Sequence, residues 1–428
     1  MLPISVQDGR SHSFIDALFM ATSAVSTTGL GVVAVGQYYT LFGQLVILIL
    51  VQIGGLGYMT LILFIIYLFG QSVSYHSGHL MEESLAMPSR GDMQDFVVRV
   101  VKLTLLFELV GALGLTLFWL HEFSLGRALY YGVFHAISAF CTAGFALFPD
   151  GFVAYQDSGL FNLMVNVISI AGAIGFFVLA ETYGVLTRIM QRLRSPRKQS
   201  FANKPMRLSL HSKLAVWVTL ALFLLGTAVL LLTNLRPTKM IWDTAVATAI
   251  FQSLSAVSTT GFNTVDISLL SSTSLVMLTA LMFIGAPTGG TGGGIKSTTF
   301  GVILLLVWAV LKSELDVNAF GRRIPRDTLI KSVAIAVTAV FWLAITVTIL
   351  TATEKDVSFL TILFETSSAL GTVGLSVGLT PLLSSIGKLL FIITMFIGRV
   401  GPLTFMFSLF GQQVDKEYRY PQEEVFVG

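Results

Sequence analysis

Long apolar runs alternate with short ones along the whole chain. A transmembrane helix needs about 20 mainly apolar residues. Runs that reach this length cover 44–69, 97–120, 160–183, 214–233, 274–311, 329–351 and 388–410. Shorter apolar segments cover 14–25, 128–140, 243–257 and 358–369. Segments this short suit helices that enter a membrane and turn back, so the pattern predicts an all-α membrane protein.

The same small-residue pattern follows each short segment. Aligned on Gly29, Gly144, Gly261 and Gly374, the segments repeat after 115, 117 and 113 residues. Phenylalanine stands ten residues before each glycine, serine six before, alanine five before and threonine two before. Glycine and threonine are common in transmembrane helices because they help helices pack. Packing alone, however, does not produce one fixed pattern in four copies.

This repetition predicts four pseudo-symmetric units around one central pore. Each unit consists of a spanning helix, a short pore helix, a Thr-x-Gly turn and a second spanning helix. The expected bounds are 1–70 for repeat 1, 71–190 for repeat 2, 191–320 for repeat 3, 321–410 for repeat 4 and 411–428 for a cytoplasmic tail. The spacing places the first helix of repeat 1 upstream of Met1, so that helix is missing here. We favour a start codon assigned too late over a truncated form.

The four turns are the candidate ion-selectivity filter. Backbone at membrane depth leaves regular helix only where it lines a cavity or is buried in protein. Glycine permits the angles that turn carbonyl groups inward, and rings of carbonyl oxygens replace the water around a cation. The side chains of these turns carry no charge, which suits a large monovalent cation better than a divalent one. The filter residues are Ser26, Thr27, Thr28, Gly29, Cys141, Thr142, Ala143, Gly144, Ser258, Thr259, Thr260, Gly261, Gly371, Thr372, Val373 and Gly374.

A second equivalent site lies in the second long helix of each repeat, beginning at Gly54, Gly172, Gly285 and Gly398. Repeat symmetry puts these residues at one depth, below the filter. In repeat 3 it expands into a glycine-rich loop, 286–296, that must break the helix. In repeat 4 it carries Arg399, and an arginine near mid-membrane costs roughly 2.5–3.5 kcal/mol unless it faces the interior and has partners. We expect Arg399 and the loop to form a gate; the alternative is that Arg399 only joins helices, for example through Glu108. The gate residues are Gly289, Gly290, Thr291, Gly292, Gly293, Gly294, Lys296 and Arg399.

Composition excludes most other classes of protein. Hydrophobic residues make up 54% of the 428 residues and charged residues 11%, against about 25% charged in soluble domains. The mean hydropathy is +0.81. A net charge of +3 is too small to indicate nucleic acid as a partner, whereas membrane lipid follows from the apolar runs. The single cysteine, Cys141, rules out an internal disulfide.

Two weaker motifs suggest enzyme or metal chemistry. Gly289 and Gly294 have the spacing of a nucleotide-binding P-loop, but Ile295 separates the second glycine from the lysine and no strand precedes it. His76 and His79, with Glu82 and Glu83, have metal-ligand spacing, but they lie in a polar connection that is better read as a solvated loop. We therefore predict a chain that is not an enzyme and holds no cofactor.

At three places the sequence resembles the Trk/Ktr/HKT potassium transporters. Residues 255–264 look like the third pore loop of that family, 286–297 look like its glycine-rich intramembrane loop, and 419–428 are similar to the ending of the KtrB type. The resemblance implies potassium uptake, with K+ at the filter carbonyls. It also implies a homodimer and a separate cytoplasmic nucleotide-binding ring of the KtrA type. Sodium dependence is known for KtrB relatives, but nothing in these residues indicates it.

The charged loops set the expected orientation. Residues 187–213 carry eight basic residues and no acid, which by the positive-inside rule makes that loop cytoplasmic. The loop 312–331 falls on the same side. The filters then open outward from a plasma membrane, the bacterial inner membrane, and the C-terminus lies inside. Two alternatives to potassium uptake stay open: a sodium or ammonium pathway, and a non-conducting membrane scaffold.

Overall fold

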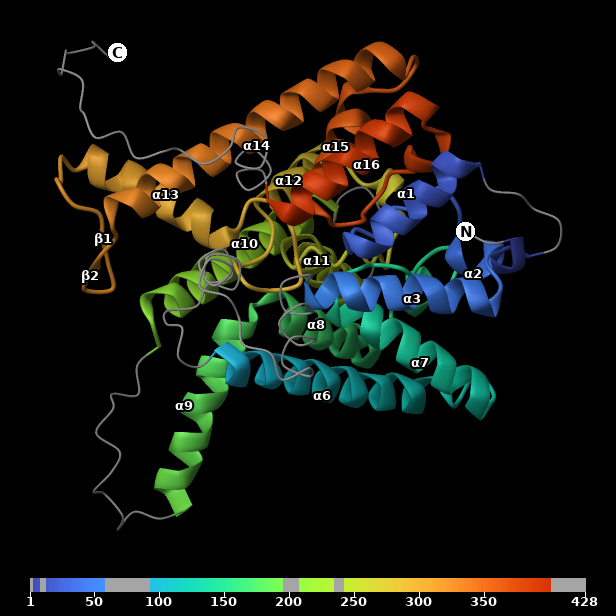
Figure 1. The fold of residues 1–428 in the computed structure, drawn as a ribbon, viewed down its shortest axis with the longest axis horizontal. Helices are drawn as coiled ribbons and strands as arrows, with labels where there is room; N and C mark the ends of the chain where they lie inside the picture. The colour runs from blue at the N-terminus through green and yellow to red at the C-terminus, as the bar shows by residue number, and fades with distance from the viewer. Residues whose placement is uncertain (1–2, 8–12, 58–92, 195–207, 235–241, 402–428) are drawn as a thin grey trace.

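The computed structural model of the protein describes residues 3–7, 13–57, 93–194, 208–234 and 242–401. This part of the chain is mostly helical, which confirms the prediction of an all-α protein (Figure 1). The strands among the described residues form one small antiparallel hairpin of β1 (Asn318–Ala319) and β2 (Arg322–Arg323). It follows α13 (Ser297–Leu311) and stands at the edge of the molecule.

The predicted short segments are four separate helices, each ending at its Thr-x-Gly turn. They are α1 (Phe14–Val25), α7 (Leu125–Phe140), α11 (Trp242–Val257) and α15 (Phe359–Gly371). Serine precedes three of them, and the hydroxyls of Ser13 and Ser358 accept hydrogen bonds from the first turns of α1 and α15. Such N-caps satisfy backbone donors that a helix start leaves free.

The short helices and the second helices of the repeats pack into a closed ring. The second helices are α3 (Leu41–Leu56), α8 (Gly159–Ala173), α12 (Ser272–Ile284) and α16 (Ser385–Val400). Each short helix contacts the second helix of its own repeat and that of the preceding repeat: α7 contacts α3, α11 contacts α8, and α15 contacts α12. The contact of α1 with α16 joins the two ends of the described chain and closes the ring (Figure 1).

Three long helices cover the outside of this ring. They are α6 (Met93–Trp119), α10 (Leu210–Asn234) and α14 (Arg326–Thr353), and they contact α7, α11 and α15 respectively. Within the described residues these are the three helices long and apolar enough to cross a membrane by themselves. Their outer faces present apolar side chains such as Leu109, Leu224 and Val337, as expected for a surface that meets lipid.

The prediction of one continuous helix over 160–183 is wrong. The chain turns by 105° between α8 and α9 (Phe176–Arg194), and α9 leaves the ring at the lower left of Figure 1. Gly175, at the break, has a φ of +98°. The other second helices also end at a glycine with positive φ: Gly57 at +76°, Gly285 at +68° and Gly401 at +99°. Each second helix thus ends at or next to a glycine of this conformation, because only glycine reverses the backbone in this way without steric cost.

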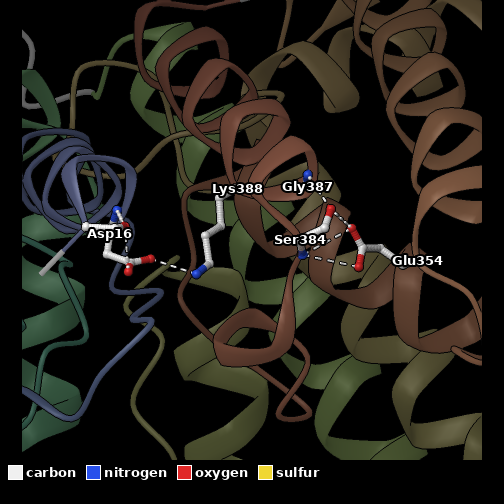
Figure 2. Close-up of polar contacts among 6 residues, drawn as sticks. Asp16, Glu354, Ser384, Gly387 and Lys388 are labelled. Carbon is white, nitrogen blue, oxygen red and sulfur yellow. Dashed lines mark hydrogen bonds and ion pairs between the residues drawn. The ribbon is translucent and has the colours of Figure 1, made fainter.

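Polar contacts at the ends of the helices connect repeat 1 to repeat 4 (Figure 2). The ammonium of Lys388 on α16 lies 2.6 Å from the carboxylate of Asp16 in the first turn of α1.

The hydroxyl of Ser384 accepts from the backbone N–H of Gly387 and donates to Glu354, at the end of α14, over 2.5 Å. Glu354 is buried, so this serine both begins α16 and satisfies an interior carboxylate.

We predict that Ser384→Ala lowers the free energy of unfolding by about 1–2 kcal/mol. The substitution removes the cap of α16 and leaves the buried Glu354 carboxylate with fewer donors. Thermal unfolding of the purified protein in detergent measures this effect. Its matched control is Ser385→Ala at the exposed neighbouring position. Equal melting temperatures for the two variants would contradict the role given to Ser384.

Candidate functional site

The four Thr-x-Gly turns share one backbone conformation. The threonine two residues before the aligned glycine is left-handed in every copy, with φ of 53°, 52°, 57° and 48° for Thr27, Thr142, Thr259 and Thr372. An L-residue in this region costs about 1–2 kcal/mol. Strain of this kind persists only where the surrounding structure enforces it, and it is concentrated at functional sites. The four strained threonines therefore mark the turns as a candidate site.

The turns form a closed ring in space, which we call the glycine ring (Gly29, Gly144, Gly261 and Gly374). A Cβ atom added to each of these glycines would fall on the backbone carbonyl of the next turn. The distances are 2.2 Å from Gly29 to the oxygen of Ala143, 2.4 Å from Gly144 to Thr260, 1.8 Å from Gly261 to Val373 and 2.2 Å from Gly374 to Thr28. This series returns to its starting turn, so the four turns surround one common axis.

The glycine-rich loop packs against all four turns at once. Thr291 contributes two contacts: its carbonyl accepts from the hydroxyl of Thr27 over 3.4 Å, and its hydroxyl lies 3.1 Å from that of Thr142. A Cβ at Gly292 would lie 2.2 Å from the hydroxyl oxygen of Thr259, and one at Gly293 would lie 2.1 Å from that of Thr372. The loop thus meets the left-handed threonine of every repeat.

Arg399 binds this loop from α16. Its guanidinium donates to the carbonyl of Thr291 and to the carbonyl of Gly54 at the end of α3. Lys296 donates to the carbonyl of Gly292 over 2.5 Å. Glu108, the alternative partner considered for Arg399, instead accepts from the thiol of Cys141 over 3.8 Å. Arg399 therefore joins the loop, α3 and α16 beneath the ring.

The other end of the loop faces the break between α8 and α9. The carbonyl of Gly289 accepts from the backbone N–H of Phe176 over 2.8 Å. A Cβ at Gly290 would lie 2.2 Å from the carbonyl oxygen of Ala173. The sequence grouped Gly289 and Gly290 with the residues below the ring. The structure instead divides the loop into one end at the bent helix and one end at the turns.

The structure explains why the second helices carry glycine at three equivalent positions, which the sequence alone did not. A Cβ on Gly54, Gly172 or Gly398 would lie 2.0, 1.7 or 2.0 Å from a carbonyl oxygen in the last turn of the short helix of the same repeat. These residues let each second helix contact its short helix at the backbone. Their equal depth was visible in the repeat alignment, but the contact was not.

Several residues singled out in the sequence lie outside the described part of the chain. They include His76, His79, Glu82 and Glu83, residues 195–207 of the basic loop and the tail 411–428. Among the described residues, no three His, Cys, Asp or Glu side chains are grouped as a metal site would require.

Residues 2–412 match the protein-family model TrkH, described as a cation transport protein. The chain belongs to this family. TrkH-family proteins are membrane cation transporters and not enzymes, in agreement with the apolar helices described above. The resemblance seen in the sequence to the Trk/Ktr/HKT group is thereby confirmed.

Curated relatives match this TrkH-family chain over its whole length. It is 39% identical over 441 residues to the Ktr system potassium uptake protein B of Bacillus subtilis, covering 100% of this chain and 92% of the relative. It is 37% identical to the protein of the same name from Vibrio alginolyticus, with 100% and 91% covered. It is 31% identical to the potassium/sodium uptake protein NtpJ of Enterococcus hirae, with 100% and 92% covered.

A solved structure has the same fold. The crystal structure of the potassium transporter TrkH from Vibrio parahaemolyticus aligns with a TM-score of 0.70 at 19% sequence identity, over 93% of this chain and 79% of that one. At this identity the match shows the fold alone.

We predict opposite effects from two glycine-to-alanine changes in this TrkH-family chain. Gly172→Ala drives a methyl group into the carbonyl of Phe140 and should lower the free energy of unfolding by about 1–3 kcal/mol or more. Gly114→Ala in α6 meets only the flexible Met164 side chain at 3.4 Å. It should leave stability unchanged or raise it by up to about 1 kcal/mol, because alanine favours helix. Thermal unfolding in detergent compares the two, and similar losses would contradict the backbone contact.

Proposed function

We propose that this protein takes up potassium across the plasma membrane through a carbonyl filter made by the four turns. The observation that carries the proposal is the closed glycine ring, in which each turn brings its carbonyl against the glycine of its neighbour. The names of the relatives, two Ktr system potassium uptake proteins and the potassium/sodium uptake protein NtpJ, support the choice of ion. The proposed filter residues are 26–29, 141–144, 258–261 and 371–374, with K+ held at their backbone carbonyls.

The chemistry of the ring favours a monovalent cation. The carbonyl oxygens of Thr28, Ala143, Thr260 and Val373 each lie against the ring glycine of a neighbouring turn. Rings of backbone carbonyl oxygens replace the hydration shell of a cation in selectivity filters. The four short helices end at the turns, so the partial negative charge of each carboxyl end adds to the attraction. The filter side chains carry no formal charge, whereas filters for divalent cations usually have rings of carboxylates.

We further propose that the loop 286–296 and Arg399 gate this pathway. The loop lies against the threonines of all four turns, so an ion that leaves the ring on that side meets it directly. The guanidinium of Arg399 holds the loop through Thr291, and its positive charge opposes a cation. Movement of the loop away from the ring would open the path. The loop contacts the start of α9 through Gly289, so a displacement of α9 would move the loop.

We also propose how the chain is divided, oriented and assembled in the membrane. Four repeats bounded as in the sequence are consistent with the cyclic contacts of the helices. Basic residues at the ends of α13 and α14 and in the hairpin, including Lys312, Arg322 and Arg326, favour a cytoplasmic side there. We propose that the C-terminal tail lies on the same side. A homodimer and a KtrA-type nucleotide-binding ring are proposed from the family resemblance, and the names of the Ktr relatives refer to a system.

Sodium is the second candidate, as the transported ion or as a coupled one. The observation that favours it is the name of a full-length relative, the potassium/sodium uptake protein NtpJ. Neutral carbonyl rings bind both monovalent ions, and the number and flexibility of the carbonyls decide between them. Uptake measured with K+ or Na+ alone, and with both together, separates transport of sodium from activation by it.

We predict that Gly261→Ser abolishes or strongly reduces potassium uptake. The added side chain would lie against the carbonyl of Val373 and strain the turn. A strain of about 1.4 kcal/mol already corresponds to a tenfold change in an equilibrium constant. Uptake is measured at low external potassium in cells lacking their own uptake systems, with expression and a cognate regulator confirmed. The control is Gly126→Ser near the start of α7, where a Cβ meets nothing within 4 Å. Undiminished uptake by Gly261→Ser with unchanged ion preference would contradict the proposed filter, and no uptake by the unaltered chain would favour a non-conducting scaffold.

We predict that Arg399→Ala, and separately a shortened loop lacking 292–293, raise the potassium flux. Arg399→Ala removes the contact between α16 and the loop and also a positive charge from the pathway, and the shortened loop loses its contacts with Thr259 and Thr372. Flux is measured in liposomes with a fixed potassium gradient, and Arg326→Ala at the exposed start of α14 is the charge-matched control. Unchanged flux in both variants would exclude the gate and leave Arg399 as a connection between helices.

A further inference from the structure

One buried position in the short helices carries a different side chain in each repeat. Nine residues before the ring glycines stand Met20, His135, Gln252 and Glu365. All four are almost fully buried, between 0 and 1% exposed. Three are polar and one is apolar. Buried polar groups require hydrogen-bond partners, so the three polar side chains indicate what this position does.

The three polar side chains bind the same place in their repeats, the residue three positions after the ring glycine. The backbone N–H of Leu147 donates to Nε2 of His135 over 3.1 Å. The amide of Gln252 donates to the hydroxyl of Thr264 over 3.2 Å. The backbone N–H of Val377 donates to Glu365 over 2.9 Å. We call these contacts the outer ties; each one closes the chain across its turn.

Glu365 makes the most extensive of the three outer ties. Besides Val377, its carboxyl group accepts from the hydroxyls of Ser376 and Thr380, over 2.5 and 2.7 Å, and from the backbone N–H of Leu379 over 3.2 Å. A carboxylate only accepts hydrogen bonds, and four donors match its capacity. The whole segment that leaves the fourth turn is therefore held by one side chain.

His135 is fixed for its outer tie by a second contact. Its Nδ1 lies 2.8 Å from the carbonyl of Tyr131, one turn earlier in α7. A carbonyl only accepts, so Nδ1 carries the proton and Nε2 is left as the acceptor for Leu147. The ring orientation is thus set within the helix before it meets the turn.

Among the described residues of repeat 1, no equivalent contact is present. Met20 offers no hydrogen bond of this strength, and its thioether lies beside Gly31. The hydroxyl of Ser23, six residues before Gly29, is buried without a partner in the part of the chain that the structure describes. Its equivalents Ser138 and Ser255 donate to the carbonyls of Phe145 and Phe262 over 2.9 and 2.7 Å. The first turn is thus held by fewer polar contacts on its outer side than the others.

We infer that His135, Gln252 and Glu365 are positioning residues of the filter. Ion discrimination depends on their three outer ties, and the first turn is the side of the ring that can move most easily. This inference rests on the proposed filter. The reason is geometric: ions of different radius need carbonyls at different distances, and a turn resists being drawn in or pushed out only if both its ends are fixed. The short helix fixes the inner end of each turn, and the outer tie fixes the other.

The test compares substitutions at this one position in different repeats. Gln252→Met keeps the length of the side chain but removes its hydrogen bond, and Glu365→Met does the same in repeat 4. Met20→Leu is the matched control, because it alters the same buried position where no outer tie exists, and it nearly conserves volume. Glu365→Gln keeps one acceptor oxygen and serves as the conservative variant. For each variant, and for Gly261→Ser, the uptake rates of K+ and Na+ are measured, normalised to the amount of protein in the membrane, and expressed as a K+/Na+ ratio.

We expect Gln252→Met and Glu365→Met to lower the K+/Na+ ratio roughly fivefold, the effect of one lost hydrogen bond, with Met20→Leu unchanged and Glu365→Gln between. A purely structural role would lower the amount of protein without moving this ratio. If the ratio stays constant in both methionine variants while Gly261→Ser still changes uptake, the inference is overturned and the filter stands. If Gly261→Ser leaves both uptake and ratio unchanged, the proposed filter itself fails. Should a methionine variant not accumulate, Glu365→Gln decides by the same ratio.

Discussion

The structure depends on a close approach between backbones around one axis. A Cβ atom built on any glycine of the ring would lie only 1.8 to 2.4 Å from the carbonyl oxygen of the neighbouring turn. No residue except glycine fits such a contact, and the positive φ at the same positions excludes other residues a second time. Four repeats must meet this condition together, because the ring closes only if every turn does. The cyclic contacts of α1, α7, α11 and α15 with their neighbouring second helices place the turns at the required distance.

Backbone that is not helical is expensive at membrane depth, and this protein concentrates it in one place. The turns, the glycine-rich loop and the ends of the second helices all lie against one another, so the polar groups released by one element find partners in the next. The carbonyls of Thr291 and Gly54 bind Arg399, and the carbonyl of Gly289 binds the start of α9. A single loop from repeat 3 thereby contacts all four turns, which breaks the symmetry of the ring on one side.

The opposite side of the ring is also unequal. Repeats 2, 3 and 4 hold the exit of each turn with a buried polar side chain, and Glu365 does so with four hydrogen bonds. Repeat 1 has a methionine there and a serine hydroxyl without a partner among the described residues. Fourfold backbone geometry is therefore combined with side chains that differ in every repeat. The backbone meets the demands of the ring, while the side chains determine how firmly each turn is held.

The sequence by itself determined the class of the protein, the four short helices and the residues of the turns. These are local properties of the chain. The length of an apolar run indicates a helix that lies in lipid, and a fixed pattern of Phe, Ser, Ala, Thr and Gly indicates four copies of one turn. It also placed Gly54, Gly172 and Gly398 at one depth. Only the tertiary structure decided what these glycines touch, that α8 bends away at Gly175, and that the loop reaches every turn. It alone paired His135, Gln252 and Glu365 with the residues beyond their turns. Those outcomes depend on how separate segments approach one another in space and on direction reversals at single glycines, and no periodicity in the chain encodes either.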